Sequence, residues 1–339
     1  YEARAVILAH GVRRRKLGCP GEEELLGKGV SYCATCDGAF FRDQEVAVIG
    51  GGPAGLSCAY YLAVMGHKVT IFEQRHHLGG MLRYGIPSYR LPRERLQAEI
   101  DWILSAGIDV ELDHSVNGEE LARLRDEFDA VYLAIGAHSD KKLGLPGEEA
   151  PGVESAVKML RAIGDDIMPD FTGKRVVVIG GGNVAMDVTR SSVRLGASSV
   201  TCVYRRRIAD MTALPDEVKG AIAEGAEVRE LCAPVRIEAN EAGEACALWV
   251  QPQIIGFADK TGRPRPETAD QPEERIPADI IVVAIGQGVE IAGFEQTGIP
   301  IRRGTFMAES SSQIDNMETV FAGGDCVTGP ATAIRAIAA

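Results

Sequence analysis

The 339-residue sequence lacks several features that would place it in other classes of protein. No apolar run reaches the roughly 18–20 residues that a membrane-spanning helix needs, and the first residues show no signal-peptide pattern. Positive charge is not in excess, because 36 Lys and Arg stand against 48 Asp and Glu, giving a net charge of −12. This balance argues against nucleic acid or an anionic membrane as a main partner. We therefore expect a cytoplasmic protein. The sequence starts without an initiator methionine, which leaves open whether the chain is a fragment or a natural fusion.

Closely spaced cysteines are also few. Of the eight cysteines, only Cys33 and Cys36 lie close together, in a C-x-x-C spacing, so the sequence excludes the disulfide framework of small secreted proteins. A structural zinc or iron–sulfur site usually needs a second cysteine pair or a histidine cluster, and the sequence therefore predicts no metal site. The Cys33–Cys36 spacing is instead typical of a redox-active dithiol.

Glycine is abundant, with 39 residues, and several glycine-ended apolar runs repeat along the chain. Three pairs of similar stretches occur in the same order: AVILAHG (5–11) with AVYLAIG (130–136), KLGCPGEE (16–23) with KLGLPGEE (142–149), and VAVIGGG (46–52) with VVVIGGG (176–182). A third apolar run, IIVVAIGQ, covers 280–287. Each such run predicts a buried parallel strand that turns near a nucleotide. A protein with one FAD domain and one NAD(P) domain needs two apolar runs of the type seen at 130–136 and 280–287. This chain has a third at 5–11, so residues 1–45 form one module too many.

The pattern of apolar and turn residues predicts the main elements. Two strand–helix–strand units are expected at 46–49, 53–65 and 68–72, and at 176–179, 183–195 and 199–204. Further helices are expected at 91–107 and 215–224, and short strands at 227–231, 235–239 and 246–252. The polar, proline-rich stretch 259–274 predicts an exposed loop.

The first unit contains the glycine pattern Gly50-x-Gly52-x-x-Gly55, and Glu73 ends the strand that follows it. In such a unit the first glycine permits a tight turn, the second lets the backbone approach a pyrophosphate, and the third allows close packing of helix on strand. The helix N-terminus then meets the phosphates, and the acid can bond ribose hydroxyls.

The second unit has Gly180-x-Gly182-x-x-Ala185, and its second strand runs into Arg205, Arg206 and Arg207 instead of an acid. Arginines can hold a 2′-phosphate in bidentate fashion, whereas an acid would repel it. The sequence therefore favours NADPH over NADH at this unit. The alternative is a solvated basic turn, in which at least one of the three arginines is only surface charge.

A third motif, VFAGGDCVTGPATAIRAIAA, covers 320–339. An apolar strand end leads to Gly324 and Asp325, and a helix is expected to start near Pro330. Asp325 could bond the ribityl chain of a flavin, and the helix N-terminus would stabilise negative charge on the reduced ring.

Together these motifs resemble the two-dinucleotide-binding-domain flavoproteins, and from 46 to 339 the chain looks most similar to the small subunit of NADPH-dependent glutamate synthase. The long stretch GGMLRYGIPSYRLPR, which begins at Gly79, carries part of this resemblance, and GGMLRYGIP should lie near the flavin. The resemblance leaves open whether Arg83, Tyr84 and Arg90 anchor this loop or take part in chemistry. It implies binding of FAD and NADPH through the motif residues Gly50, Gly52, Pro53, Ala54, Gly55, Glu73, Gly80, Met81, Gly136, Gly180, Gly182, Asn183, Val184, Ala185, Arg205, Arg206, Gly286, Gly324 and Asp325.

Residues 1–45 resemble a different family, thioredoxin reductase, through the CATC motif that contains Cys33 and Cys36. In that family CATC precedes an NADPH-type glycine pattern, whereas here an FAD-type pattern follows. A join within VAVIGGG, by gene fusion or by assembly error, would explain the extra module. Two interpretations remain: the dithiol exchanges electrons with the flavin, or the segment is an inert remnant.

The sequence thus predicts an α/β fold with two Rossmann-like domains, in which the NADPH domain is inserted in the FAD domain. We expect a thioredoxin reductase-like segment at 1–45, an FAD domain at 46–148 and 286–339, and an NADPH domain at 149–285. The expected reaction is hydride transfer from NADPH to FAD and onward electron transfer to an acceptor, with no side-chain acid or base required. The iron–sulfur region of the glutamate synthase small subunit has no counterpart here, which implies an external acceptor or partner subunit. The alternatives are a disulfide reductase using Cys33 and Cys36 and an inactive nucleotide-binding fragment.

Overall fold

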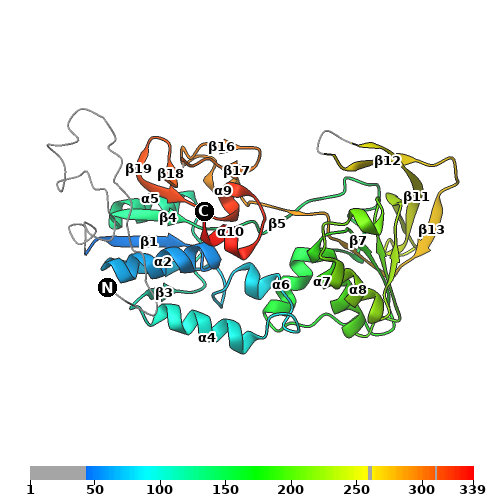
Figure 1. Ribbon diagram of the computed structural model, residues 1–339, viewed down its shortest axis with the longest axis horizontal. Coiled ribbons are helices and arrows are strands. Elements are labelled where there is room, and N and C mark those ends of the chain that lie inside the picture. Colours follow the sequence, from blue (N-terminus) through cyan, green and yellow to red (C-terminus); the bar gives the residue numbers. More distant parts are fainter. Residues whose placement is uncertain (1–42, 259–261, 310) are drawn as a thin grey trace, which may run out of the picture.

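The computed structural model describes residues 43–258, 262–309 and 311–339. Two mainly parallel sheets lie toward opposite ends of the molecule, and helices α6 (Ala156–Gly164) and α7 (Asn183–Arg194) lie between them (Figure 1). The chain passes from the first sheet to the second at β5 (Ser139–Asp140) and returns at β15 (Gln287–Gly288). These two short strands pair antiparallel with each other, so the outgoing and returning segments run side by side.

The first sheet has the strand order β18-β19-β4-β1-β2-β3. Its strands are β1 (Glu45–Ile49), β2 (Lys68–Phe72), β3 (Asp109–Glu111), β4 (Ala130–Leu133), β18 (Gln313–Ile314) and β19 (Met317–Ala322). All pairs are parallel except β18 with β19. Successive residues of β1 face opposite sides of the sheet, so Ala47 and Ile49 join one apolar cluster while Val46 and Val48 join the other.

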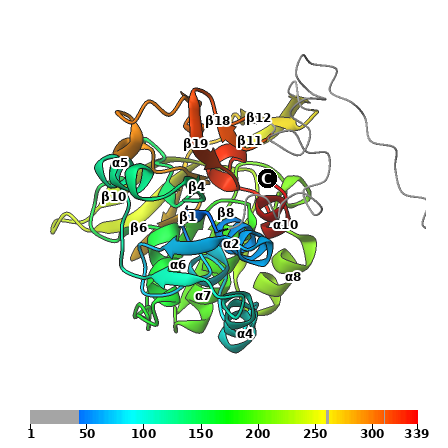
Figure 2. The same cartoon turned by 90° about the vertical axis from the view of Figure 1, so that its left-hand side faces the viewer.

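Helices cover this sheet on both faces. They are α2 (Pro53–Met65), α3 (Met81–Tyr84), α4 (Arg93–Leu104), α5 (Gly118–Glu127), α9 (Asp325–Thr328) and α10 (Ala333–Ile337). Figure 2 shows α2, α4 and α10 together on one side of the first sheet. Helix α2 begins at Pro53, which suits the first helical position, and ends at Gly66, whose left-handed backbone (φ +97°) lets its N–H cap the last turn.

The second sheet has the strand order β6-β14-β7-β8-β9, with all pairs parallel. Its strands are β6 (Val153–Ser155), β7 (Arg175–Ile179), β8 (Ser199–Val203), β9 (Glu227–Arg229) and β14 (Ile280–Val283). Helices α6, α7 and α8 (Pro215–Ala223) pack on one face. An antiparallel sheet of β10 (Cys232–Ala239), β11 (Ala245–Ala258), β12 (Pro264–Thr268) and β13 (Glu274–Pro277) supplies the apolar cover of the other face.

The predicted exposed loop at 259–274 is wrong over part of its length. Pro264–Thr268 forms β12, which pairs antiparallel with β11 and makes a projecting hairpin at one end of the molecule (Figure 1). Because β12 is an edge strand, Pro264 and Pro266 can occupy it without breaking a hydrogen-bond ladder on a second side. The low apolar content that indicated a loop reflects this edge position.

Two predicted helices are shorter than expected. The helix predicted at 91–107 covers Arg93–Leu104, with Pro92 as its N-cap. The helix expected near Pro330 begins at Ala333, after the separate short helix α9 that starts at Asp325. Gly329 has a positive φ of +80° and Pro330 follows it, so the helical conformation is interrupted between α9 and α10.

Candidate cofactor site

A cavity of about 550 Å³ lies at the carboxyl ends of the strands of the first sheet and extends to the start of α7. It brings together predicted residues from six separate stretches of the chain. Open α/β sheets bind ligands at this position, outside the carboxyl ends of their strands. The predicted residues that line it are Gly50, Gly52, Pro53, Ala54, Glu73, Gly80, Met81, Gly136, Asn183, Val184 and Asp325.

The first glycine turn is shaped by close backbone contacts. Gly50 has φ +106°, and a Cβ there would run into the carbonyl of Ala134; a Cβ on Gly55 would overlap the carbonyl of Gly50. Gly52 is the N-cap of α2, and no side chain accepts a hydrogen bond from the first amides of the helix at this position. The amide groups that begin α2 therefore lack a side-chain acceptor beside the cavity, which is a favourable place for an anion such as a pyrophosphate.

Glu73 ties the end of β2 to this turn. Its side chain is buried, and its two oxygens accept hydrogen bonds from the amides of Gly51 (2.7 Å) and Arg75 (2.9 Å). Burial raises the pKa of Glu73, and the two amide bonds oppose that shift. Each carboxylate oxygen keeps a second lone pair that can accept a hydrogen bond from a ribose hydroxyl.

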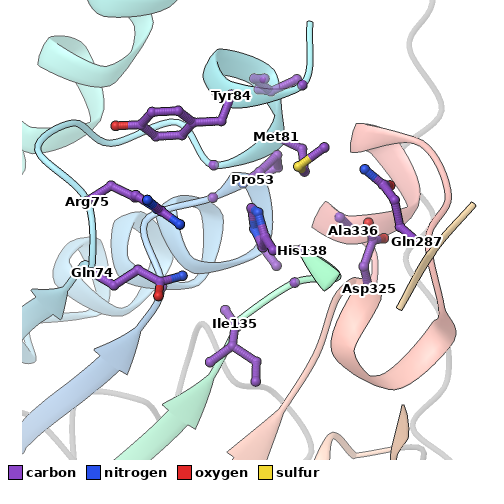
Figure 3. Close-up of a pocket in the computed structure, with 18 of the residues that line it drawn as sticks. Pro53, Gln74, Arg75, Met81, Tyr84, Ile135, His138, Gln287, Asp325 and Ala336 are labelled. Carbon is purple, nitrogen blue, oxygen red and sulfur yellow. The ribbon is translucent and has the colours of Figure 1, made fainter. Parts of the chain in front are cut away.

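The part of the cavity lining beside α10 holds two buried polar atoms without partners among the described residues. Within the described residues, neither Oδ1 of Asp325 nor Nε2 of Gln287 has a hydrogen-bond partner. The two side chains lie close to each other beside α10 (Figure 3). Unpaired buried polar groups are costly, so an acceptor and a donor placed together here fit a polyhydroxyl chain such as the ribityl group of FAD. Sequence reasoning missed Gln287, although it is the last residue of the repeated run IIVVAIGQ.

His138 is a second lining residue that the sequence did not predict. It occupies the centre of the cavity wall, between Arg75 and Gln287 (Figure 3). Burial, together with the positive charges of Arg161 and Arg75, lowers the pKa of His138 to about 4. The imidazole is therefore neutral at pH 7.

The stretch 79–93 forms the wall of the cavity that faces the second sheet. Met81, Tyr84 and Arg90 line the cavity. Arg90 binds the carboxylate of Asp187 on α7, with its Nη1 2.8 Å from both oxygens, and Arg83 lies 3.7 Å from Asp166. Of the two roles left open by the sequence, anchoring is what these two arginine contacts provide.

The second glycine turn has the same backbone design. Gly180 has φ +153°, a Cβ on it would run into the Ala284 carbonyl, and the side chain of Ala185 is fully buried against the turn. The amides of Thr212 and Ala213 donate to the carbonyl of Gly181 (3.0 and 3.1 Å). Only Asn183 and Val184 of this turn and helix start, with Asp187 beyond them, reach the cavity.

The three arginines after β8 differ in their surroundings. Arg207 is paired with Asp210 through two contacts of 2.8 and 3.0 Å. Nε of Arg206 donates a hydrogen bond to the carbonyl of Pro264 (3.0 Å), and the side chain of Arg205 is exposed. Two guanidinium groups thus keep donors for a phosphate, and the third is neutralised by its neighbour.

Some predicted residues lie elsewhere. Gly286 lies against Lys141, outside the cavity lining. Gly324 has φ +72° and packs against Ala54 of α2, where it shapes the turn before Asp325. Cys33 and Cys36 lie outside the described residues.

Comparison with protein families gives a match to the pyridine nucleotide-disulphide oxidoreductase model over two overlapping ranges, residues 1–86 and 44–339. The chain therefore belongs to the pyridine nucleotide-disulphide oxidoreductase family. This membership confirms the predicted fold class and the predicted enzyme class, an oxidoreductase that uses a pyridine nucleotide and a flavin.

Several curated proteins are similar over most of the chain. The beta subunit of NADP(+)-dependent formate dehydrogenase from Moorella thermoacetica is 41% identical over 298 residues, which cover 87% of this chain and 42% of that protein. The small chain of NADPH glutamate synthase from Escherichia coli (strain K12) is 35% identical over 312 residues, covering 87% of this chain and 66% of that protein. The predicted resemblance to the glutamate synthase small subunit is confirmed. The chain spans less than half the length of the formate dehydrogenase subunit.

Solved structures share the fold at lower identity. FprA from Mycobacterium tuberculosis in complex with NADPH has a TM-score of 0.72 at 21% identity and covers 86% of this chain and 80% of its own. The thioredoxin reductase of Lactococcus lactis has a TM-score of 0.62 at 19% identity, covering 87% of this chain and 95% of its own. Across the described part of the chain, no helix combines the length and apolar character needed to cross a membrane.

Proposed function

We propose that this chain is the NADPH-oxidising flavin module of a larger enzyme and delivers electrons to a partner domain or subunit. The observation that carries the proposal is the cavity itself, whose lining contains both an uncapped helix N-terminus at Gly52 and the unpaired polar atoms of Asp325 and Gln287. Those are the two chemistries, anionic and polyhydroxyl, that one FAD molecule presents. Two relatives, the beta subunit of formate dehydrogenase and the small chain of glutamate synthase, are named as parts of larger enzymes, which supports the existence of a partner.

The proposal assigns 46–148 and 286–339 to FAD and 149–285 to NADPH. The residues proposed to hold FAD are those of the first glycine turn, Glu73, Gly80, Met81, Gly136 and Asp325. Gln287, which the sequence motifs did not predict, is added to this set. Those proposed to hold NADPH are the second glycine turn with Asn183, Val184 and Ala185, and Arg205 with Arg206. FAD, when bound, supplies the ring that accepts a hydride from NADPH, and the chain contributes position and electrostatics.

An anaerobic titration of the flavin-loaded full chain with NADPH tests the proposal. Full reduction at one equivalent of NADPH per flavin is expected if the flavin alone stores electrons. Two equivalents would add Cys33 and Cys36 as a second two-electron store and would favour the disulfide reductase. In that case the Cys33→Ser variant should return to one equivalent. A flavin that NADPH fails to reduce would overturn the proposal.

A further inference from the structure

An ion pair joins the two halves of the cavity wall. Nη1 of Arg90 lies 2.8 Å from both oxygens of Asp187, although the two residues are 97 positions apart. The Asp187 side chain is 4% exposed and that of Arg90 22%, so the pair is largely shielded from water. A partly buried, charge-assisted contact of this kind holds its two backbones at a defined separation.

Further contacts brace the pair on both sides. Nε of Arg90 lies 3.2 Å from Glu217 of α8. The ring of Tyr89 packs under the guanidinium groups of Arg190 (4.7 Å) and Arg194 (4.0 Å) of α7. The stretch that contains Arg90 therefore contacts both α7 and α8, which pack on the second sheet.

The pair also lies between the two proposed cofactor positions. Asp187 is on α7, five residues after Gly182, and Asn183 and Val184 at the start of the same helix line the cavity. Arg90 belongs to the stretch that places Met81 in the lining of the same cavity. A shift of α7 relative to this stretch would change the distance between a nucleotide on the second glycine turn and a flavin beside Met81.

We propose that Arg90 and Asp187 are a positioning pair that sets the distance and angle between NADPH and the flavin for hydride transfer. This inference rests on the proposed function. Neither residue exchanges a proton or an electron. Reactions that depend on a near-attack geometry lose rate steeply when that geometry loosens, by about 100-fold for a displacement near 1 Å.

The test is stopped-flow reduction of the flavin-loaded full chain by saturating NADPH under anaerobic conditions. Arg90→Gln and Asp187→Asn should each lower the limiting rate constant by roughly 10- to 100-fold, while the Kd for NADP⁺ and the flavin content change less than about threefold. The double variant should lose no more than either single variant, because both remove one contact. Arg90→Lys, which keeps the charge but not the geometry, should fall between wild type and Arg90→Gln.

A matched control is Arg175→Gln. Arg175 also makes a short ion pair with Asp279 (2.6 Å), but this pair is more exposed and lies at the start of β7, at the end of that strand away from Gly180. This variant should reduce its flavin at the wild-type rate. Reduction by dithionite, which needs no bound nucleotide, should be the same in all variants.

The pH dependence offers a readout that a purely structural role would not move. Burial raises the pKa of Asp187 to about 6, and the bond from Arg90 opposes this shift. The charged and titratable groups that face Asp187 are Arg90, Tyr89, Glu217 and Arg190. In wild type the limiting rate should fall as the pH drops through about 6 and Asp187 becomes protonated. The limiting rate of Asp187→Asn should not change across this pH range. Glu217→Gln, which removes a negative charge that raises the pKa of Asp187, should move the fall in rate to lower pH.

The outcomes separate this inference from the proposed function. A wild-type flavin that NADPH does not reduce refutes the function. A wild-type flavin that is reduced, with Arg90→Gln and Asp187→Asn reduced at the same rate, refutes the positioning pair alone. Slower reduction by dithionite as well as by NADPH would also refute it, because the loss would then reflect a damaged fold. If Arg90→Gln does not fold, Asp187→Asn and Arg90→Lys decide the question.

Discussion

Removing the guanidinium groups of Arg205 and Arg206 should shift nucleotide preference away from NADPH. Arg205 is exposed, and Arg206 uses only its Nε on a backbone carbonyl, so both keep terminal donors for a 2′-phosphate. Hydrogen bonds to charged groups contribute about 1.5–3 kcal/mol each when shielded, and exposure reduces that value. For the pair together we expect about 2–3 kcal/mol, which is a drop of roughly 30- to 150-fold in the NADPH-to-NADH preference.

Arg207 supplies the matched control. It lies next to Arg206 in the sequence, but both contacts from its guanidinium go to Asp210. Arg207→Ala removes the same charge from the same turn, yet should change the preference less than about threefold. The comparison therefore separates a specific phosphate contact from the general effect of positive charge.

The assay is steady-state oxidation of NADPH and of NADH with an artificial electron acceptor, from which kcat/KM is obtained for each nucleotide. The double variant should lose kcat/KM for NADPH and keep that for NADH, because NADH has no 2′-phosphate. An unchanged ratio in the double variant, or an equal loss in Arg207→Ala, would refute the assignment of these arginines.

Three further predictions concern the cavity. Gly55→Ala places a Cβ on the Gly50 carbonyl, so the purified chain should hold little flavin and lose about 1–3 kcal/mol of stability, as chemical denaturation would measure; normal flavin content would contradict this. Asp325→Asn should weaken FAD binding roughly 10-fold by calorimetric titration, and an unchanged Kd would exclude Asp325 as a ligand. The pKa of His138 is lowered from 6.5 to about 4, so wild type should lose roughly 3 kcal/mol relative to His138→Gln as pH falls from 6.5 to 4; parallel unfolding curves would show that His138 is not buried as described.

Local structure could be predicted where short-range rules decide it. The helix predicted at 53–65 and the strand at 68–72 have those bounds in the structure, because Pro53 starts the helix and Gly66 ends it. The same rules failed at 264–268, where prolines that read as a loop belong to an edge strand. The identity of the neighbouring strand, which the local sequence does not contain, decides such a case.

The site could be predicted only where a motif carries its own geometry. The first glycine turn and Glu73 meet because the turn and strand are one continuous unit. Gln287 and His138 reach the cavity because the chain crosses between the sheets at β5 and β15, close to both residues. The Arg90–Asp187 contact depends on how α7 packs against the turn between α3 and α4, and neither residue belongs to a sequence pattern that predicts the other.

The two glycine units show how one backbone plan can serve two nucleotides. In the first unit the carboxylate of Glu73 turns inward and accepts the amide of Gly51, so the strand end presents an acid to the turn. In the second unit the ring of Tyr204 packs over Gly181, the equivalent glycine. That ring fills the place of the inward carboxylate, and the next residue, Arg205, points to solvent. The charge offered at the two strand ends is therefore opposite, and this difference follows from which residue covers the turn, since the strands and helices of the two units have nearly the same lengths.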